Sequence, residues 1–370
     1  MNILIAAEYR APFGGNFIGS LLDLAAAIKA RGDSVVFLFP KLSEGERPWC
    51  EWIRKNGYEV LFADLSTPEE EQLRFLKSVL DEKQIDLMHL HFEIYSHLIR
   101  KYAKDLKPTR ILIHDHMDYA TGRSETKQRL RLNALSVAYA FRGYGLITVM
   151  KKKLNAYAFM PKKCFVPNGV SMIRNVEFFS SRSATRTQLG IKDDERLAIL
   201  FGWDMKRKGV DVAAQAIALL RQRGHKVLLG LIGGNAEKYR SFIGQYGVDP
   251  NGDWIRFIDS REDIYSLHRA ADVLLSASRN EGFSYAILEA ISQNTPVAVS
   301  DIPGTRWAEQ YDKCVIYPVE SPEACADAIL RAIQFGDAPS NAEKIIEEYS
   351  IEKWCSRVLE IYDRMCPTVK

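Results

Sequence analysis

The sequence predicts an α/β protein with two Rossmann-like domains. Short runs rich in β-branched and apolar residues alternate with helical patterns along all 370 residues, as in parallel sheets covered by helices. This alternation runs through residues 1–167 and starts again at residue 197. A chain of this length can also bury two hydrophobic cores of ordinary size. We therefore expect an N-terminal domain at 1–170 and a C-terminal domain at 185–350.

The predicted elements follow from local periodicity. Strands of the first domain are predicted at residues 2–7, 34–39, 58–63, 86–91, 110–114, 145–150 and 163–167. Strands of the second are predicted at residues 197–203, 226–233, 254–258, 272–278, 296–300 and 313–318. Helical periodicity covers residues 19–32, 210–224 and 349–365. The polar stretch 180–195 mostly lacks apolar periodicity and is predicted to be a linker.

Composition indicates a soluble globular protein. Hydrophobic residues make up 47% and charged residues 26%, and no apolar run approaches the roughly 18 residues of a membrane span. The first ten residues look like a buried strand and not a signal peptide, so we expect a cytoplasmic protein. The six cysteines are scattered without metal-binding spacing, and we expect them to be reduced and mostly structural.

Positive charge is concentrated in the first domain. Residues 1–170 hold 25 Lys and Arg against 19 Asp and Glu, and a dense basic stretch extends from residue 121 to Lys163. Leucines are interleaved with this charge, which would suit an amphipathic element on an anionic membrane at the inner face of the cell. A solvated helix face explains the same pattern. No nucleic-acid-binding motif accompanies it, and we expect no nucleic-acid partner.

Two carboxylates, Glu281 and Glu289, stand eight positions apart just after the predicted strand 272–278. Between them, Gly282, Phe283 and Ser284 open a helix, where free backbone N–H groups and the positive end of the helix dipole suit a phosphate. An anion flanked by two carboxylates indicates a nucleotide with hydroxyl-rich groups at both ends.

Two loops at strand ends are candidates for phosphate contact. Gly14 and Gly15 follow the first strand, and paired glycines let a backbone approach a diphosphate, although a tight turn without a ligand needs them equally. Lys206, Arg207 and Lys208 follow the strand 197–203, at the end of an open sheet where ligands bind. Three adjacent cations would repel one another without an anionic partner, which favours a ligand.

His114 ends the predicted strand 110–114. It can hydrogen-bond a sugar hydroxyl or serve as a satisfied structural histidine. His89 and His91 alternate on one strand and are predicted to be a packed or hydrogen-bonded pair. The chain contains no Asp-x-Asp, which disfavours a metal-chelated diphosphate, so we expect neither a metal nor a cofactor.

Together these motifs resemble the retaining glycosyltransferases of family 4. The resemblance rests on the glycine loop, the segment VPNGV at 166–170, the Arg207–Gly209 segment and the Glu-x7-Glu segment at 281–289. It implies the GT-B fold, in which two Rossmann-like domains face a central cleft. It also implies that a final helix at about 352–370 packs back on the first domain. In one departure, Trp203 follows Gly202 where many relatives carry an arginine.

The resemblance also implies a role for each site residue. The catalytic candidates are Glu281 at the sugar hydroxyls, His114 near the reacting carbon, and Arg207 and Lys208 at the diphosphate. The substrate-binding candidates are Gly14, Gly15, Gly282, Phe283, Ser284, Glu289 at the ribose, and Arg261 at the base. The first domain would bind the acceptor and the second the nucleotide sugar.

The expected reaction is transfer of a sugar from a nucleotide diphosphate sugar to an acceptor hydroxyl with retention, without a metal. The expected donor is a UDP-sugar, and the acceptor is a glycan or a lipid-linked molecule. A nucleotide-sugar epimerase of the same fold and a non-catalytic nucleotide-sugar-binding protein remain alternatives. The absence of GxGxxG disfavours a Rossmann oxidoreductase.

Overall fold

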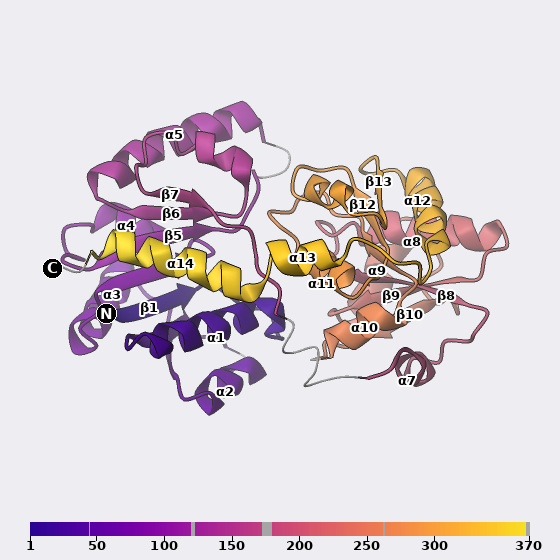
Figure 1. Cartoon of the computed structure of the whole chain (residues 1–370), viewed down its shortest axis with the longest axis horizontal. Coiled ribbons are helices and arrows are strands. Elements are labelled where there is room, and N and C mark those ends of the chain that lie inside the picture. Colours follow the sequence, from indigo (N-terminus) through magenta and orange to yellow (C-terminus); the bar gives the residue numbers. More distant parts are fainter. Residues whose placement is uncertain (44, 120–122, 172–179, 262, 368–370) are drawn as a thin grey trace. The chain divides into compact units, whose positions relative to one another are not determined.

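The chain folds into two α/β units (Figure 1). This computed structural model describes residues 1–43, 45–119, 123–171, 180–261 and 263–367. The first unit comprises Met1–Gly169 with Ile351–Lys370, and the second comprises Val170–Ser350. Residues 172–179 of the segment between the predicted domains, and 368–370 of the predicted last helix, lie outside the described residues.

The first unit is built on one parallel sheet. Its strands are β1 (Asn2–Ala7), β2 (Ser34–Pro40), β3 (Glu59–Ala63), β4 (Leu87–His91), β5 (Arg110–Asp115), β6 (Gly145–Thr148) and β7 (Lys163–Phe165). Its helices are α1 (Gly15–Ala30), α2 (Pro48–Lys55), α3 (Glu69–Glu82), α4 (Ser96–Lys101), α5 (Glu125–Phe141), the 3-10 helix η1 (Lys151–Asn155) and α14 (Ile351–Met365).

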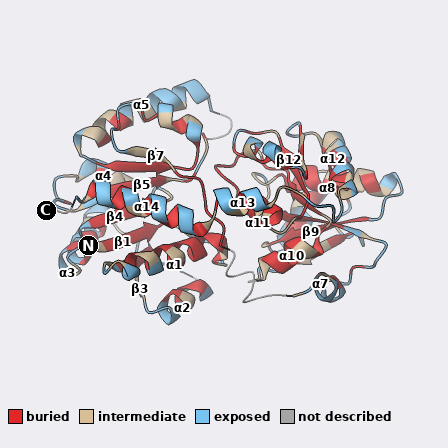
Figure 2. Cartoon of the chain, viewed as in Figure 1, coloured by how far each residue is buried: buried red, intermediate tan, exposed pale blue. Residues whose placement is uncertain are grey.

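The strand order of the first sheet is β3-β2-β1-β4-β5-β6-β7. Every pair of neighbouring strands is parallel. Strand β4 is buried at every position, because helices cover both faces of a parallel sheet, and Figure 2 shows the strands as the most buried part of the unit. Leu4, Leu38, Met88 and Leu90 lie in one hydrophobic cluster of this core.

The second unit repeats this plan. Its strands are β8 (Arg196–Phe201), β9 (Val227–Ile232), β10 (Ile255–Ile258), β11 (Val273–Ser276), β12 (Val297–Ser300) and β13 (Cys314–Tyr317), in the spatial order β10-β9-β8-β11-β12-β13. Its helices are α7 (Arg182–Gln188), α8 (Val210–Gln222), α9 (Ala236–Gly244), α10 (Ile264–Ala270), α11 (Tyr285–Ser292), the 3-10 helix η2 (Arg306–Gln310), α12 (Pro322–Gln334) and α13 (Glu343–Glu348). The predicted fold class, α/β with two Rossmann-like domains, is confirmed.

Helix α1 begins earlier than the sequence predicts. Its first residue is Gly15, whereas the apolar periodicity starts near residue 19. The first turn is held by Phe17, which is buried and packs edge-on against His91 and Phe92. Aromatic contacts at the strand ends therefore extend the helix into a glycine-rich segment whose sequence resembles a loop.

The prediction of a linker over residues 180–195 is wrong, because helix α7 lies there. Ser181 caps this helix, and its hydroxyl accepts a hydrogen bond from the backbone N–H of Ala184. Arg182 and Arg186, one turn apart, bind the carboxylate of Asp272 at 2.7 and 3.0 Å. Ion pairs hold this helix in place, so its sequence carries little apolar periodicity.

Helix α14 belongs to the first unit and packs beside α1 (Figure 1). Its apolar side recurs at helical spacing, with Trp354, Val358, Ile361 and Tyr362 all buried. The hydroxyl of Tyr362 lies 2.7 Å from His89 Nδ1 on β4. The end of the described chain is thereby tied to the centre of the first sheet.

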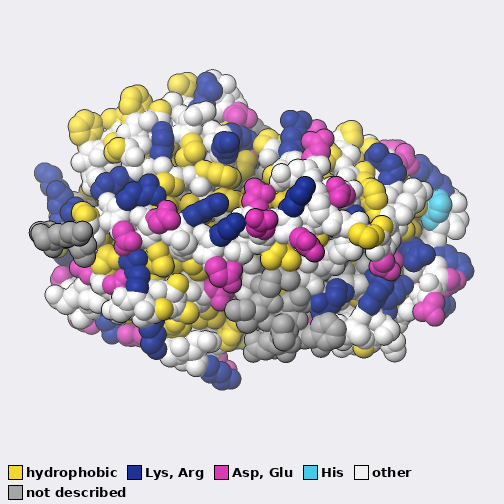
Figure 3. All heavy atoms as spheres, viewed as in Figure 1, with side chains coloured by type: hydrophobic (Ala, Val, Ile, Leu, Met, Phe, Trp, Pro, Cys, Tyr) yellow, Lys and Arg dark blue, Asp and Glu magenta, His cyan; other side chains and the backbone are white. Residues whose placement is uncertain are grey.

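Helix α5 presents apolar side chains to solvent among its cations. Leu130 is 61% exposed and Phe141 is 90% exposed. Figure 3 shows hydrophobic side chains at the upper left edge, where α5 runs, with Lys and Arg close by. Among the described helices, none combines the length and the hydropathy that crossing a membrane requires.

Some lysines of the predicted basic stretch are paired with carboxylates. Lys152 pairs with Asp118 at 2.7 Å, and Lys153 pairs with Asp115 at 2.6 Å. Lys153 is also 5% exposed and donates to the carbonyl of Met117. These two lysines neutralise carboxylates within the first unit. Of the exposed cations of the predicted patch, Lys127, Arg129 and Arg131 lie on α5.

Candidate functional site

The candidate site of the second unit lies where its strand order reverses. The chain runs from β8 outward to β9 and β10, then returns to place β11 on the other side of β8. Open α/β sheets bind ligands at such a switch point, beyond the carboxyl ends of the strands. The loops that follow β8 and β11 carry Arg207, Lys208 and Glu281, so topology brings these predicted residues together.

Glu281 forms the centre of this site. Lys208 Nζ lies 2.5 Å from Glu281 Oε1, and Arg207 Nη1 lies 3.3 Å from the same oxygen. The hydroxyl of Ser278 donates to this oxygen at 2.9 Å. Glu281 is buried, and both cations are mostly covered. Two cations and one carboxylate therefore converge at the strand ends.

The pKa of Glu281 lies below its usual range. Burial raises the pKa, but the positive charges of Lys208 and Arg207 and the hydrogen bonds from Lys208 and Ser278 outweigh it. Glu281 is therefore ionised at neutral pH, and both of its oxygens can accept hydrogen bonds.

The three adjacent cations have carboxylate partners within the second unit. Besides the two cations bound to Glu281, Lys206 Nζ lies 3.3 Å from Asp211. Arg207 Nε also binds Asp204 at 2.9 Å. These carboxylates lie within five positions of their partners, so local ion pairs already relieve the repulsion that the bare sequence suggested.

Gly209 fixes the distance between the two loops. It adopts a left-handed backbone conformation, with φ of +69°, and caps helix α8. A Cβ atom at this position would stand 2.0 Å from the carbonyl oxygen of Ala277. Glycine is therefore required for the loop after β8 to approach the end of β11 and present Lys208 to Glu281.

The residues between the two glutamates form the mouth of helix α11. Ser284 precedes the helix with extended backbone angles, φ −74° and ψ 119°. Phe283 stacks on Trp307 with 4.4 Å between ring centroids. Gly282, Phe283 and Ser284 are all buried. The first N–H groups of α11 are thus held beside Glu281, as an anion site at a helix start requires.

Glu289 lies inside α11 and is 4% exposed. Its Oε2 lies 3.2 Å from Nε2 of His268, a fully buried residue of α10. No pattern in the sequence singles out His268, since an isolated histidine in an apolar helix usually belongs to the core. The contact holds the carboxylate that the resemblance assigns to a ribose.

Arg261 is already engaged within the second unit. Its guanidinium binds Asp263 through Nε and Nη2 and donates to Gln188 Oε1 at 2.9 Å. Its contact with a nucleotide base stays a prediction.

The glycine loop lies at the corresponding switch point of the first unit. There β1 and β4 are neighbours, and Ala7 at the end of β1 faces His91 at the end of β4. Gly14 caps helix α1, and Gly15 has a φ of +53°. Among the described residues, a Cβ atom on Gly15 would meet only Phe13, at 3.9 Å. The backbone at Gly15 therefore has open space beside it, which a phosphate approach requires.

His114 is packed in a cluster of four histidines. Its ring lies 4.1 Å from that of His116 and 4.9 Å from that of His91, between centroids. Its Nδ1 lies 3.2 Å from His89 Nε2. His114 is 1% exposed, so its side chain is more enclosed than the predicted contact with a sugar suggests. The residues forming this cluster come from β4, β5 and the position after β5.

The hydrogen bonds among Tyr362, His89 and His114 determine which ring nitrogens of the two histidines carry protons. Burial keeps the pKa of Tyr362 far above its usual range, so its hydroxyl stays protonated. If the hydroxyl donates to His89 Nδ1, His89 donates through Nε2 to His114 Nδ1, and within this chain of bonds His114 Nε2 is left without a partner among the described residues. In the reverse arrangement, His114 would donate to His89 and His89 would donate to Tyr362, so the phenolic proton of Tyr362 would also lack an acceptor. His114 therefore carries its proton on Nε2, as a hydrogen-bond donor.

The same cluster is the place where the described residues could hold a metal ion. His89, His91 and His114 each offer a nitrogen, and these atoms lie within 4.8 Å of one another. Burial lowers the pKa of His89 to about 3, and the pKa of the other two lies well below its ordinary value. All three are thus neutral at pH 7, the state in which imidazole binds metals.

The second unit is similar to a family of known proteins. Residues 181–349 match the family model "Glycosyl transferases group 1". The lipopolysaccharide glucosyltransferase WaaG of Escherichia coli is 33% identical over 127 residues, which are 34% of this chain and 33% of WaaG. In WaaG and seven further curated relatives, the matched part covers less than half of the relative.

Solved structures extend the likeness to both units. A sucrose-phosphate synthase from Thermosynechococcus elongatus has a TM-score of 0.74 at 18% identity, covering 98% of each chain. Anabaena Alr3699/HepE in complex with UDP-glucose has a TM-score of 0.73 at 16% identity, covering 98% of this chain and 100% of its own. Residues 181–349 thus match a glycosyl transferases group 1 domain, and the whole chain shares its fold of two α/β units with these solved structures.

Proposed function

We propose that the protein is a retaining glycosyltransferase of family 4. It transfers a sugar from a UDP-sugar to an acceptor hydroxyl, in the synthesis of a cell-surface polysaccharide or a glycolipid. The observation that carries this proposal is the convergence of Arg207 and Lys208 on Glu281 at the switch point of the second sheet. The group 1 domain, the likeness to WaaG and the UDP-glucose complex of a structural neighbour support it.

In this proposal, Arg207 and Lys208 neutralise the diphosphate of the donor. Negative charge grows on that group as the bond to the sugar breaks, and preorganised cations stabilise it most in the transition state. A buried carboxylate, that of Glu281, already holds both cations in position, so their side chains need little reorganisation when the donor binds.

The remaining residues of the second unit bind the two ends of the donor. Ionised Glu281 accepts hydrogen bonds from the transferred sugar, and Glu289 accepts them from the ribose. The backbone N–H groups at Gly282, Phe283 and Ser284 add to the phosphate site. This set needs no metal, because Lys, Arg and backbone donors provide the positive charge.

The proposed roles in the first unit are acceptor binding and recognition of phosphate and sugar groups. Gly15 would approach the diphosphate through its backbone, and its open surroundings support that role. His114 would donate from Nε2 toward the sugar, in keeping with the proton positions deduced above. The departing phosphate can itself take the proton of the acceptor hydroxyl.

We also infer attachment to an anionic membrane at the inner face of the cell. The support is the exposed Leu130 on α5, which is flanked in sequence by Arg129 and Arg131, both exposed. Lys152 and Lys153 contribute little to this surface, because both are paired with carboxylates.

The deciding experiment is acceptor-dependent release of the nucleotide. A glycosyltransferase releases UDP from the donor only when it transfers the sugar. An epimerase would convert the sugar without an acceptor, and a binding protein would bind the donor without releasing UDP. We expect Lys208→Ala to lower turnover by about 100-fold or more while weakening donor affinity less. Wild-type turnover in this variant would refute the role of Lys208.

A further inference from the structure

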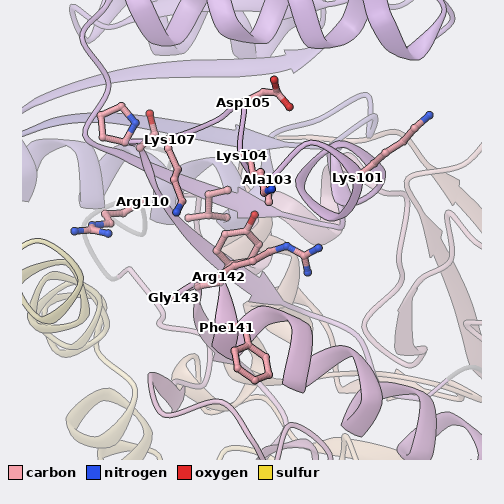
Figure 4. A pocket seen from close by; sticks show the side chains of 13 residues that line it. Lys101, Ala103, Lys104, Asp105, Lys107, Arg110, Phe141, Arg142 and Gly143 are labelled. Atoms are coloured by element: carbon pink, nitrogen blue, oxygen red, sulfur yellow. The ribbon is translucent and has the colours of Figure 1, made fainter.

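A large cavity of the first unit lies away from Gly15 and His114, the candidate site residues of that unit. It has a volume of about 720 Å³ and is lined by residues 101–111, which lead into β5, and 141–144, which lead into β6 (Figure 4). It therefore opens at the amino ends of these strands. Gly15 and His114 lie at the carboxyl ends of the same parallel sheet, on the opposite edge.

Positive charge dominates this cavity. The charged residues lining it are Lys101, Lys104, Asp105, Lys107, Arg110 and Arg142. Lys101 is neutralised by Glu69 at 2.6 Å. Within the described part of the chain, the side chains of Lys104, Lys107 and Arg110 form no ion pair. Four cations thus share the cavity with one carboxylate, an arrangement that an anion would relieve.

Arg142 is held in place as a donor. Its Nη2 donates to the carbonyl of Arg100 at 2.9 Å, and its Nη1 donates to the carbonyl of Ala138 at 3.3 Å. A guanidinium has five N–H groups, so three remain for a ligand. Beneath it, the buried hydroxyl of Tyr144 donates to the carbonyl of Ile99. Because carbonyls and not carboxylates hold Arg142, its full positive charge remains available.

An exposed aromatic ring stands at the rim of the cavity. Phe141 is 90% exposed and directly precedes Arg142, and Figure 4 shows its ring turned away from the guanidinium. Leu130 lies eleven positions earlier on α5, about three helical turns away, and thus on the same side of the helix. Apolar side chains beside a cationic cavity suit the boundary between lipid headgroups and acyl chains.

We propose that this cavity binds a phosphate ester, with Arg142 and Lys107 as its main ligands. The exposed ring of Phe141 favours the headgroup of an anionic phospholipid over a free sugar phosphate as the source of that phosphate. The cavity is separate from Gly15 and His114, because its residues lie at the other edge of the first sheet. It would fix one defined point of the first unit to a membrane surface.

The test compares matched double variants of the full chain. Lys107→Gln with Arg142→Gln removes two cavity cations, while Lys29→Gln with Lys77→Gln removes two exposed lysines elsewhere in the same unit. Sedimentation with vesicles of phosphatidylcholine and phosphatidylglycerol measures binding to lipid. Calorimetric titration of glycerol 3-phosphate measures binding of a soluble phosphate ester. We expect the cavity variant to bind vesicles about 30-fold more weakly, and the control less than about threefold.

Two further variants separate the outcomes. Phe141→Ser should weaken vesicle binding while leaving glycerol 3-phosphate binding unchanged. Asp105→Asn should strengthen phosphate binding by about fivefold, because it removes a negative charge that repels phosphate. This gain tests the proposal even if the double variant unfolds. If wild type binds glycerol 3-phosphate but not vesicles, and the double variant loses this binding, the cavity is a phosphate site and the lipid source is rejected. Equal binding by the double variant and the control would overturn the proposal.

Discussion

At the residue scale, Glu281 shows how a buried carboxylate stays charged. Its pKa is lower in the folded chain than the value of about 4.3 expected when unfolded, because Lys208 and Arg207 outweigh burial. Its contribution to stability is therefore present above about pH 4.3 and is lost as the pH falls through the lower folded value.

We predict that Glu281→Gln lowers the free energy of unfolding at pH 7 by about 1.5–3 kcal/mol, the usual size of a hydrogen bond to a charged group. The difference from wild type should shrink in more acidic solution, below about pH 4. Urea unfolding at both pH values measures it. Glu51→Gln, which breaks only an exposed pair with Lys55, should change little. An equal loss at both pH values would rule out this account.

The protons of the histidine cluster provide a second prediction at this scale. Tyr362→Phe removes the hydroxyl that donates to His89 Nδ1 and should destabilise the first unit by about 1–3 kcal/mol. In wild type, nitrogen NMR should find the proton of His114 on Nε2, and the variant should show a mixture of tautomers. A wild-type His114 protonated on Nδ1 would contradict the hydrogen-bond accounting.

At the element scale, one carboxylate fastens helix α7. Asp272 accepts from Arg182, Arg186 and Arg196 and from the backbone N–H of Leu197. It is mostly buried, so its removal leaves cations without a partner.

We predict that Asp272→Asn lowers the free energy of unfolding by about 3–5 kcal/mol and exposes α7 to proteolysis. Asp194→Asn is the matched control, since Asp194 forms an exposed pair with Lys226 and its loss should cost less than about 1 kcal/mol. Similar stability of the two variants, measured by thermal unfolding, would show that α7 is held by other contacts.

The elements that the sequence reveals are those built on repeated apolar patterns. Each strand predicted in the two domains has a counterpart within a few residues, because buried parallel strands need near-continuous apolar runs. Helix α7 and the first turn of α1 are missed, since an ion-pair cluster and aromatic packing hold them instead. The partners of Lys206 and Glu289 could not be predicted either, because Asp211 and His268 carry no motif.

At the scale of the whole molecule, the two units should differ in their response to acid. Burial first, and neighbouring charge second, lowers the pKa of His89 to about 3, and burial lowers that of His116 to about 3. His91 and His114 also have a pKa well below the ordinary value, with burial again the main cause. These groups stabilise the fold fully above about pH 6.5, and the stability is lost as the pH falls toward their folded values.

We predict that the first unit loses stability progressively as the pH falls below about 6.5, because the folded state disfavours protonation of its buried histidines. Hydrogen exchange at neutral pH and at about pH 5, corrected for intrinsic rates, should show residues 1–169 opening before residues 180–350. Loss of protection in the second unit first would contradict the assignment of these buried neutral histidines.

The central claim is that the second unit binds a nucleotide diphosphate sugar at its switch point. Calorimetric titration of UDP-glucose tests it most directly, on wild type, Glu289→Ala and the exposed control Glu237→Ala. We predict saturable binding by wild type and by the control, and binding about 10- to 100-fold weaker by Glu289→Ala. Absence of binding by wild type to UDP-glucose and to other nucleotide sugars, or equal affinity in all three proteins, would contradict the claim.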